Sequence, residues 1–329
     1  MKKVLFLAVA ATMLFAACNK TEVVYDNDPQ EISFLAVNKV ATKAPVDGTT
    51  FLTEDDMTVA AYLAQGDAGN NATTNGNYFP GTLFENNGTY WAGGRYWPLS
   101  ESIINFLAIS QPGAIFPVAT VFDATTPASG AVVTLDDNAP YQYDLMYAAG
   151  QGHCKPGSYP VVPMVFRHAL TWIYFNVNTN ATGVDRIRVN SITLNDAVYN
   201  GKLTVTNNSY NVKSTYASAD ANVEAEWTVV GPEQDVAVSC PGGVACVAAA
   251  QPFGNGLLIL PGAQKSFTVN YTITHSTGVT NTFDYTHVLA GTWDMAKKYI
   301  YNITLNLNEI LIDPVVKDWV DVETNVPLG

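Results

Sequence analysis

Residues 299–307 read Tyr-Ile-Tyr-Asn-Ile-Thr-Leu-Asn-Leu, and residues 267–274 read Phe-Thr-Val-Asn-Tyr-Thr-Ile-Thr. In both stretches large apolar residues largely alternate with polar ones. Successive side chains of a β-strand point to opposite faces of its sheet, so this period of two predicts strands with one buried and one solvated face. Similar short stretches, separated by turn-forming residues, recur along the chain at the spacing expected of β-sandwiches.

The composition agrees with an all-β fold. The chain has 329 residues, of which 11% are aromatic and 14% charged, with 24 glycines and 17 prolines, a profile of many short strands and turns. Residues 103–109 are apolar enough for a central strand, and residues 165–177 are expected to form one strand. We expect two tandem β-sandwich domains, at residues 44–160 and 161–329.

The N-terminus is typical of an exported bacterial protein. Met1-Lys2-Lys3 precedes an apolar run that ends in Ala16-Ala17-Cys18. Residues 1–17 are therefore expected to be a removable signal peptide, too short to span a bilayer. Small residues directly before Cys18 favour lipidation of its thiol, and an ordinary signal peptide with an incidental cysteine is the alternative.

A strand pattern at residues 31–38 follows a polar tether, and Lys39 and Lys43 come directly after it. The small, polar residues around Lys43 would be accessible to a trypsin-like protease if they lie in a loop. Taken alone, this stretch favours a simpler interpretation, in which the first strand of a sandwich is followed by a loop that contains lysines.

Charge and cysteine content exclude several functions. A net charge of −13 makes nucleic acid a poor partner, because phosphate binding needs clustered Lys and Arg. Cys154, Cys240 and Cys246 cannot all pair internally, although Cys240 and Cys246 could form a disulfide.

We expect no metal site and no cofactor. His168 lies in an apolar stretch where a structural role is favoured, and no catalytic motif is present, so an enzyme is not expected.

The aromatic residues Tyr90, Trp91, Tyr96 and Trp97 allow two interpretations. Aromatic side chains on strands usually pack in the core, and this is the favoured interpretation. A platform on which sugars stack is the alternative.

Several short motifs occur along the chain in an order that is typical of one family. By these motifs the chain resembles the fimbrillin family, the lipoprotein-precursor pilins of Bacteroides and Porphyromonas that build type V pili. They are the residues before Cys18, Glu31-Ile32-Ser33-Phe34, Ala41-Thr42-Lys43-Ala44, Arg95-Tyr96-Trp97-Pro98, Asn105-Phe106-Leu107-Ala108, Tyr143-Asp144-Leu145-Met146-Tyr147-Ala148, Phe166-Arg167-His168-Ala169-Leu170, Tyr299-Ile300-Tyr301-Asn302-Ile303-Thr304-Leu305 and Asp318-Trp319.

The resemblance implies two transthyretin-like sandwiches and assembly by strand exchange. A lipidated precursor, with palmitate and related acyl chains on Cys18, would reach the outer membrane with residues 18–43 as a propeptide. A trypsin-like surface protease would cut after Lys43, with Lys39 as second choice, and remove the first strand, in which Ile32, Phe34, Leu35 and Val37 are the apolar residues. A donor strand from the next subunit's segment 315–322, with Val316, Val320 and Val322 on one face, would then fill the groove.

On this interpretation the partners are other pilin subunits, joined head to tail into an extracellular fimbria that supports adhesion to host or bacterial surface ligands. Residues beyond Asp318-Trp319 favour a stalk subunit over an anchor or a tip. The alternative is a monomeric surface lipoprotein that binds glycan through exposed aromatic residues.

Overall fold

The computed structural model describes residues 30–36, 55–64, 77–111, 120–122, 131–134, 143–181, 186–198, 201–207, 223–229, 232–307 and 310–319. Every regular element within these ranges is a β-strand, which confirms the all-β prediction. Within the same ranges nothing helical is long and apolar enough to cross a membrane. The signal peptide and several predicted site residues lie outside the described part of the chain, namely Cys18, Val37, Lys39, Lys43, Val320 and Val322.

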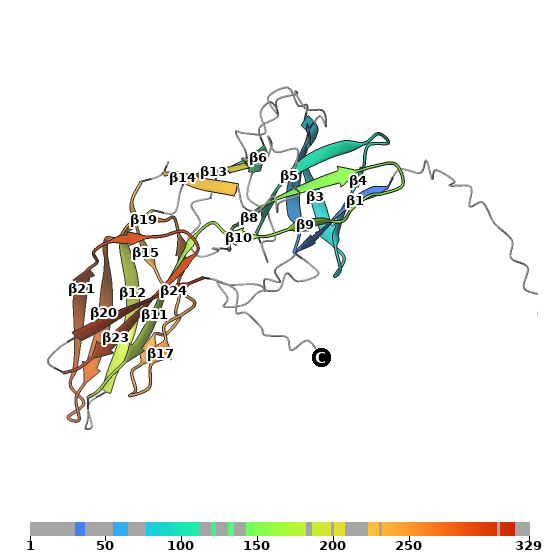
Figure 1. Ribbon diagram of the computed structural model, residues 1–329. Helices are drawn as coiled ribbons and strands as arrows, with labels where there is room; N and C mark the ends of the chain where they lie inside the picture. The colour runs from blue at the N-terminus through green and yellow to red at the C-terminus, as the bar shows by residue number, and fades with distance from the viewer. Residues whose placement is uncertain are drawn as a thin grey trace, which may run out of the picture.

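The first sheet contains eight strands in the order β10-β8-β5-β2-β3-β4-β1-β9 (Figure 1). Its central strand β5 is buried over most of its length, as predicted for residues 103–109. The strands are β1 (Glu31–Ala36), β2 (Met57–Ala64), β3 (Asn77–Asn86), β4 (Trp91–Tyr96), β5 (Ser102–Ser110), β8 (Met146–Cys154), β9 (Val162–Met164) and β10 (Arg167–His168).

Two glycines of β8 allow this sheet to fold over itself. A Cβ atom at Gly150 would lie 2.7 Å from Met164 Sδ, and one at Gly152 would lie 2.3 Å from the Trp97 ring. Both distances are too short for real atoms, so only glycine lets β9 and Trp97 pack directly on β8. The strands β4, β1 and β9 therefore form a second layer over the layer that contains β5 and β8.

The first sheet extends past residue 160, where the sequence predicted a domain boundary. β9 pairs in parallel with β1, and β10 pairs with β8. The predicted single strand 165–177 is also divided, into β10 and β11 (Thr171–Asn178). The reason is that Ala169 N donates a hydrogen bond to Leu145 O at 2.8 Å, which holds the chain on the first sheet before it passes to the next.

Two further sheets carry most of the remaining strands. One has the order β17-β11-β23-β24, with β18 also paired to β11, and the other has the order β15-β12-β20-β21, with β16 also paired to β12. Their bounds are β12 (Arg186–Ala197), β15 (Gln234–Ala237), β16 (Val244–Ala245), β17 (Gln251–Pro252), β18 (Leu257–Ile259), β20 (Ser266–Thr274), β21 (Thr280–Val288), β23 (Lys297–Leu305) and β24 (Ile310–Asp318).

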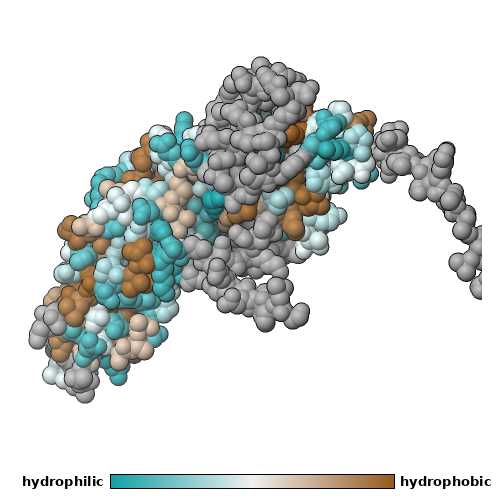
Figure 2. Space-filling model, viewed as in Figure 1, coloured by the Kyte–Doolittle hydropathy of each residue, from teal (hydrophilic) through white to brown (hydrophobic). Residues whose placement is uncertain are grey.

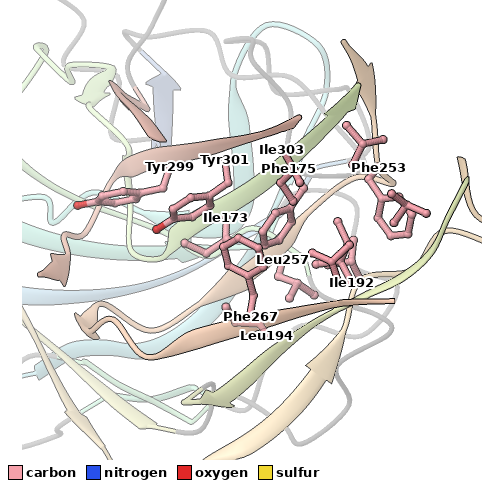
Figure 3. Close-up of a cluster of buried hydrophobic side chains, with 14 of the residues drawn as sticks. Ile173, Phe175, Ile192, Leu194, Phe253, Leu257, Phe267, Tyr299, Tyr301 and Ile303 are labelled. Carbon is pink, nitrogen blue, oxygen red and sulfur yellow. The ribbon is translucent and has the colours of Figure 1, made fainter. Parts of the chain in front are cut away.

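The inner faces of these two sheets share one apolar core, part of which Figure 3 shows. The rings of Phe175, Phe267 and Tyr301 have centroids 5.1–5.6 Å apart. Along β23 the predicted alternation is confirmed, because Tyr299, Tyr301, Ile303 and Leu305 are buried while Ile300, Asn302 and Thr304 are only partly so. The two sheets thus form a β-sandwich.

A smaller sheet joins strands from distant parts of the chain. Its order is β14-β13-β7-β6, with β6 (Thr120–Phe122), β7 (Ala131–Thr134), β13 (Gly201–Asn207) and β14 (Val223–Val229). Strands that the sequence assigned to different halves are therefore paired with each other. A two-residue pair, β19 (Gly262–Ala263) with β22 (Thr292–Trp293), completes the described strands.

A third buried cluster lies where these sheets meet. It takes side chains from β5 and β8 of the first sheet, from β11 and β18 of the sandwich, and from β13. Trp319, the residue that follows β24, completes the cluster. Apolar contacts, and not only the covalent chain, therefore connect the two halves of the protein.

Raising the pH above 10 is expected to weaken the sandwich through Tyr301. Burial raises the pKa of this phenol from 10.0 to about 12, and its oxygen accepts a hydrogen bond from Trp293 Nε1 at 3.0 Å. Between these two pH values the unfolded chain loses the proton first. The stabilisation is therefore complete below pH 10 and is lost as the pH rises through the folded-state pKa.

Urea unfolding of wild type and Tyr301→Phe between pH 7 and pH 12 tests this expectation. The variant should be less stable at pH 7 by about 1–3 kcal/mol, because the buried Trp293 N–H loses its acceptor. As the pH rises above 10, the free energy of unfolding of the variant should fall less steeply than that of the wild type. An unchanged slope in the variant would contradict the assignment to Tyr301.

Candidate functional site: the first strand and its groove

The strand β1 lies inside the first sheet and has a neighbour on each side. It pairs antiparallel with β4, where Phe34 stands opposite Trp91, and parallel with β9, where Phe34 stands opposite Val162. Among the described strands, β9 pairs with β1 alone. The sequence predicted the strand itself, and the structure adds that this N-terminal segment links two strands that are distant in sequence.

The inward side chains of β1 are fully buried. Ile32 and Phe34 are both 0% exposed. The Phe34 ring packs edge-on against Phe106 of β5 at 4.9 Å and against Phe84 of β3 at 5.0 Å between centroids. Complete burial of such side chains stabilises a fold by roughly 1.5–3 kcal/mol each. Leu35, which was also predicted as part of the removable strand, points outward and is 46% exposed.

Polar contacts hold the start of β1. The carbonyl oxygen of Gln30 accepts a hydrogen bond from Trp97 N at 2.8 Å. The Glu31 carboxylate accepts one from Gly94 N, also at 2.8 Å. Gly94 has a φ of 63°, a left-handed conformation that glycine adopts without strain. The first strand is therefore fixed by its backbone as well as by its apolar side chains.

Loss of β1 would open a groove of defined shape. Its two walls would be β4, which would still pair with β3, and β9, which would have no neighbour among the described strands. Its floor would include the rings of Phe84 and Phe106, which now contact Phe34. Such a groove accepts an extended segment, because backbone hydrogen bonds give affinity and alternate side-chain positions give selectivity.

The predicted donor segment is divided by the structure. Val316 lies in β24, where it stands opposite Tyr299 of the same chain and is 55% exposed. Residues 315–318 thus already belong to a sheet of their own subunit. Lys297 Nζ also forms an ion pair with the Asp318 carboxylate at the end of this strand. A free donor strand that starts at residue 315 would require β24 to leave its sheet.

Trp319 fixes the chain directly after β24. Its ring stacks on His168 of the first sheet, with centroids 3.9 Å apart and an interplanar angle of 11°. Trp319 N donates a hydrogen bond to Ala296 O at 3.0 Å. His168 Nδ1 lies 2.6 Å from Asp144 Oδ2, so this histidine is hydrogen-bonded, as predicted. Nothing in the spacing of His168 and Trp319 signalled that they meet, because the contact depends on the junction between sheets.

The tryptophans of the aromatic cluster are core residues. Trp91 is 3% exposed and Trp97 is 2% exposed. Trp91 Nε1 donates a hydrogen bond to Asp55 O at 2.8 Å. Tyr90 and Tyr96 are exposed, but without the tryptophans they do not form the predicted alternative, a sugar-stacking platform. The packing interpretation of Trp91 and Trp97 is confirmed.

In the described ranges Cys154 and Cys246 are buried, and no cysteine belongs to a cluster that could hold a metal ion. Cys154, Cys240 and Cys246 are free, so the structure contains no bond between Cys240 and Cys246. Burial raises the pKa of the Cys154 thiol, and it raises the pKa of Cys246 to about 11. Both thiols are therefore protonated at neutral pH, the unreactive form. Across the described residues no three His, Cys, Asp or Glu side chains gather around a possible metal position.

Comparisons with known proteins agree with this architecture. No curated protein sequence matches the chain. A fimbrial protein from Bacteroides vulgatus has a similar structure, with a TM-score of 0.51 and 14% identity, over 88% of this chain and 99% of that one. A Bacteroides ovatus protein, whose name proposes a role in cell adhesion, has a TM-score of 0.50 and 14% identity, over 90% of this chain and 99% of that one.

The family model described as fimbrillin-like matches residues 42–319, which is most of the chain. This match includes both the first sheet from β2 onward and the sandwich up to Trp319. Proteins of this family are structural and adhesion proteins and not enzymes. The chain therefore belongs to the fimbrillin-like family, and it is a pilus-related protein of the cell surface.

Proposed function

We propose that this protein is a structural subunit of a surface fimbria and that it polymerises by exchange of its first strand. The observation that supports the proposal best is the position of β1. An N-terminal strand that has a neighbour on both sides, and whose Ile32 and Phe34 are completely buried, leaves a groove when it is removed. Cleavage of the chain after this strand is the step that would allow its removal.

The proposed sequence of events begins at the membrane. The precursor is lipidated on Cys18 and carried to the outer membrane, where β1 completes the first sheet and prevents premature assembly. A trypsin-like protease then cuts after Lys43, and residues 18–43 leave together with β1. The lysine and the small residues around it supply the sequence support for this step.

The donor strand is proposed to begin after Trp319. Val320 and Val322 are two residues apart, as are Ile32 and Phe34, so each pair presents both side chains to one face of a strand. Val316 stays in β24 of the subunit that supplies the donor. β24 therefore anchors the donor segment to its own subunit. A valine fills less of the groove than Phe34 does, so backbone pairing with β4 and β9 would supply much of the affinity.

Such a contact joins two different surfaces of identical subunits. One subunit offers its groove and the next offers its C-terminal segment, so the interaction does not close on itself and propagates as a filament. The filament is the extracellular form of the protein, and adhesion is its proposed biological effect. The names of fimbrial and adhesion proteins with the same fold agree with this role.

Mutation of the lysines tests the processing step. Trypsin treatment of the purified precursor should produce an N-terminus at Ala44 and a ladder of oligomers on non-reducing gels without boiling. Lys43→Gln should reduce both products at least about tenfold, while Lys39→Gln, the matched control, should leave them unchanged. Oligomers that form equally well with Lys43→Gln, with residues 18–43 still attached, would contradict strand removal.

Variants of the C-terminal segment test the donor. Val320→Asp with Val322→Asp places two charges on the face proposed to enter the groove, and an unpaired buried charge is strongly destabilising. Light scattering of the cleaved protein should then show loss of polymers. Asp321→Asn, on the opposite face, is the control and should still polymerise. Normal polymers from the double variant would show that the donor lies elsewhere.

A further inference from the structure

The sandwich has one long edge strand without the usual protection against pairing. β21 is nine residues long, and its nine pairs with β20 are continuous and contain no bulge. No described strand pairs with its other side, and Figure 1 shows it at the left-hand edge of the molecule. Its sequence, Thr-Asn-Thr-Phe-Asp-Tyr-Thr-His-Val, has no proline and no lysine, and its one acidic residue is Asp284.

The other edges of the described sheets are short or blocked. β6, β9, β10, β15, β16, β17 and β18 have between two and four residues each. β24 is equally long, but Pro314 lacks a backbone N–H at its centre, and β14 carries Glu224 and Glu226. Short strands, proline and charge are the common devices that prevent edge-to-edge pairing, so β21 stands out as an edge that is left available.

The side chains of β21 also favour a partner. Phe283 is 42% exposed and stacks on Tyr271 of β20, with ring centroids 5.4 Å apart. Val288, at the end of the strand, is 76% exposed. Figure 2 shows apolar patches at the left-hand side of the surface, the side on which Figure 1 places β21. A second strand beside β21 would cover part of this apolar surface.

We propose that β21 pairs antiparallel with β21 of a second copy, so that two β-sandwiches share one continuous sheet. Pairing centred on Asp284 would place two like charges directly opposite each other, which is destabilising. If the pairing register is shifted so that Phe283 stands opposite Phe283 of the second copy, each Asp284 stands opposite the Thr282 hydroxyl of the other copy. Aromatic side chains then face each other at the twofold axis, an arrangement that favours cross-strand pairing.

The charges of the chain favour a second β21 over its own terminal segments as the occupant. The segment after Trp319 carries Asp321 and Glu323, and the tether before β1 carries Glu22, Asp26 and Asp28. Each segment carries at least two carboxylates, whereas β21 carries only Asp284. In the shifted β21 pair no carboxylate stands opposite another. The contact uses neither β1 nor the C-terminal segment, so it is a lateral contact that is independent of strand exchange.

Sedimentation velocity of the uncleaved chain tests this pairing. Cys18→Ala removes the lipid site, and intact β1 excludes strand exchange, so dimers in this sample do not arise from exchange of the first strand. A dimer should appear as the protein concentration rises, and added salt should strengthen it, because two copies with net charge −13 repel each other. A protein that stays monomeric at all concentrations would overturn the proposal.

Opposite charges at one position test the register. Thr282→Asp places a carboxylate opposite Asp284 of the second copy and should raise the dimer Kd about fivefold, whereas Thr282→Lys should lower it by a similar factor. Thr89→Lys, at an exposed position between β3 and β4 of the first sheet, is the matched control and should change the Kd little. Equal effects of Thr282→Asp and Thr282→Lys would contradict the register. A dimer that is unchanged by both would show that copies associate through another surface.

Discussion

The rest of the first sheet depends on the position of Phe34 in β1. Its ring contacts side chains from β3 and β5, and its backbone lies between β4 and β9. Here β1 is the only described strand that pairs with β9. The sheet is therefore complete only while a strand occupies this position, whether it comes from the same chain or from another.

The C-terminal side of the molecule complements this arrangement. β24 is fixed in its sheet, and Trp319 is held against His168 at the junction with the first sheet. A chain that leaves such a rigid point can present an extended segment to a neighbour in a defined direction. The proposed groove lies between β4 and β9, and the proposed donor follows β24, so the two are different surfaces of one subunit, as a head-to-tail filament requires.

Much of the fold follows from local patterns. The alternation in β20 and β23 predicts which residues are buried, and the apolar run in β5 predicts a central strand. Ile32 and Phe34 could also be recognised, because they share one face of a short strand. The core positions of Trp91 and Trp97 follow from the usual behaviour of aromatic residues on strands.

Long-range pairing could not be predicted in this way. β9 is only Val-Pro-Met, and three residues with a central proline carry no strand signal of their own. The pairing of β7 with β13 and the stacking of Trp319 on His168 are set by how whole sheets meet. The expected boundary at residue 160 was misplaced for the same reason, since β9 and β10 return to a sheet that began far earlier in the chain.

Hydrogen exchange at the backbone amides of β4 and β9 tests the central claim most directly. We expect protection in the precursor, fast exchange in cleaved monomers that have lost residues 18–43, and renewed protection in filaments. This sequence would show that a strand from another subunit takes the place of β1. Filaments in which these amides exchange as fast as in the cleaved monomer, or in which β1 is still bound, would contradict the account.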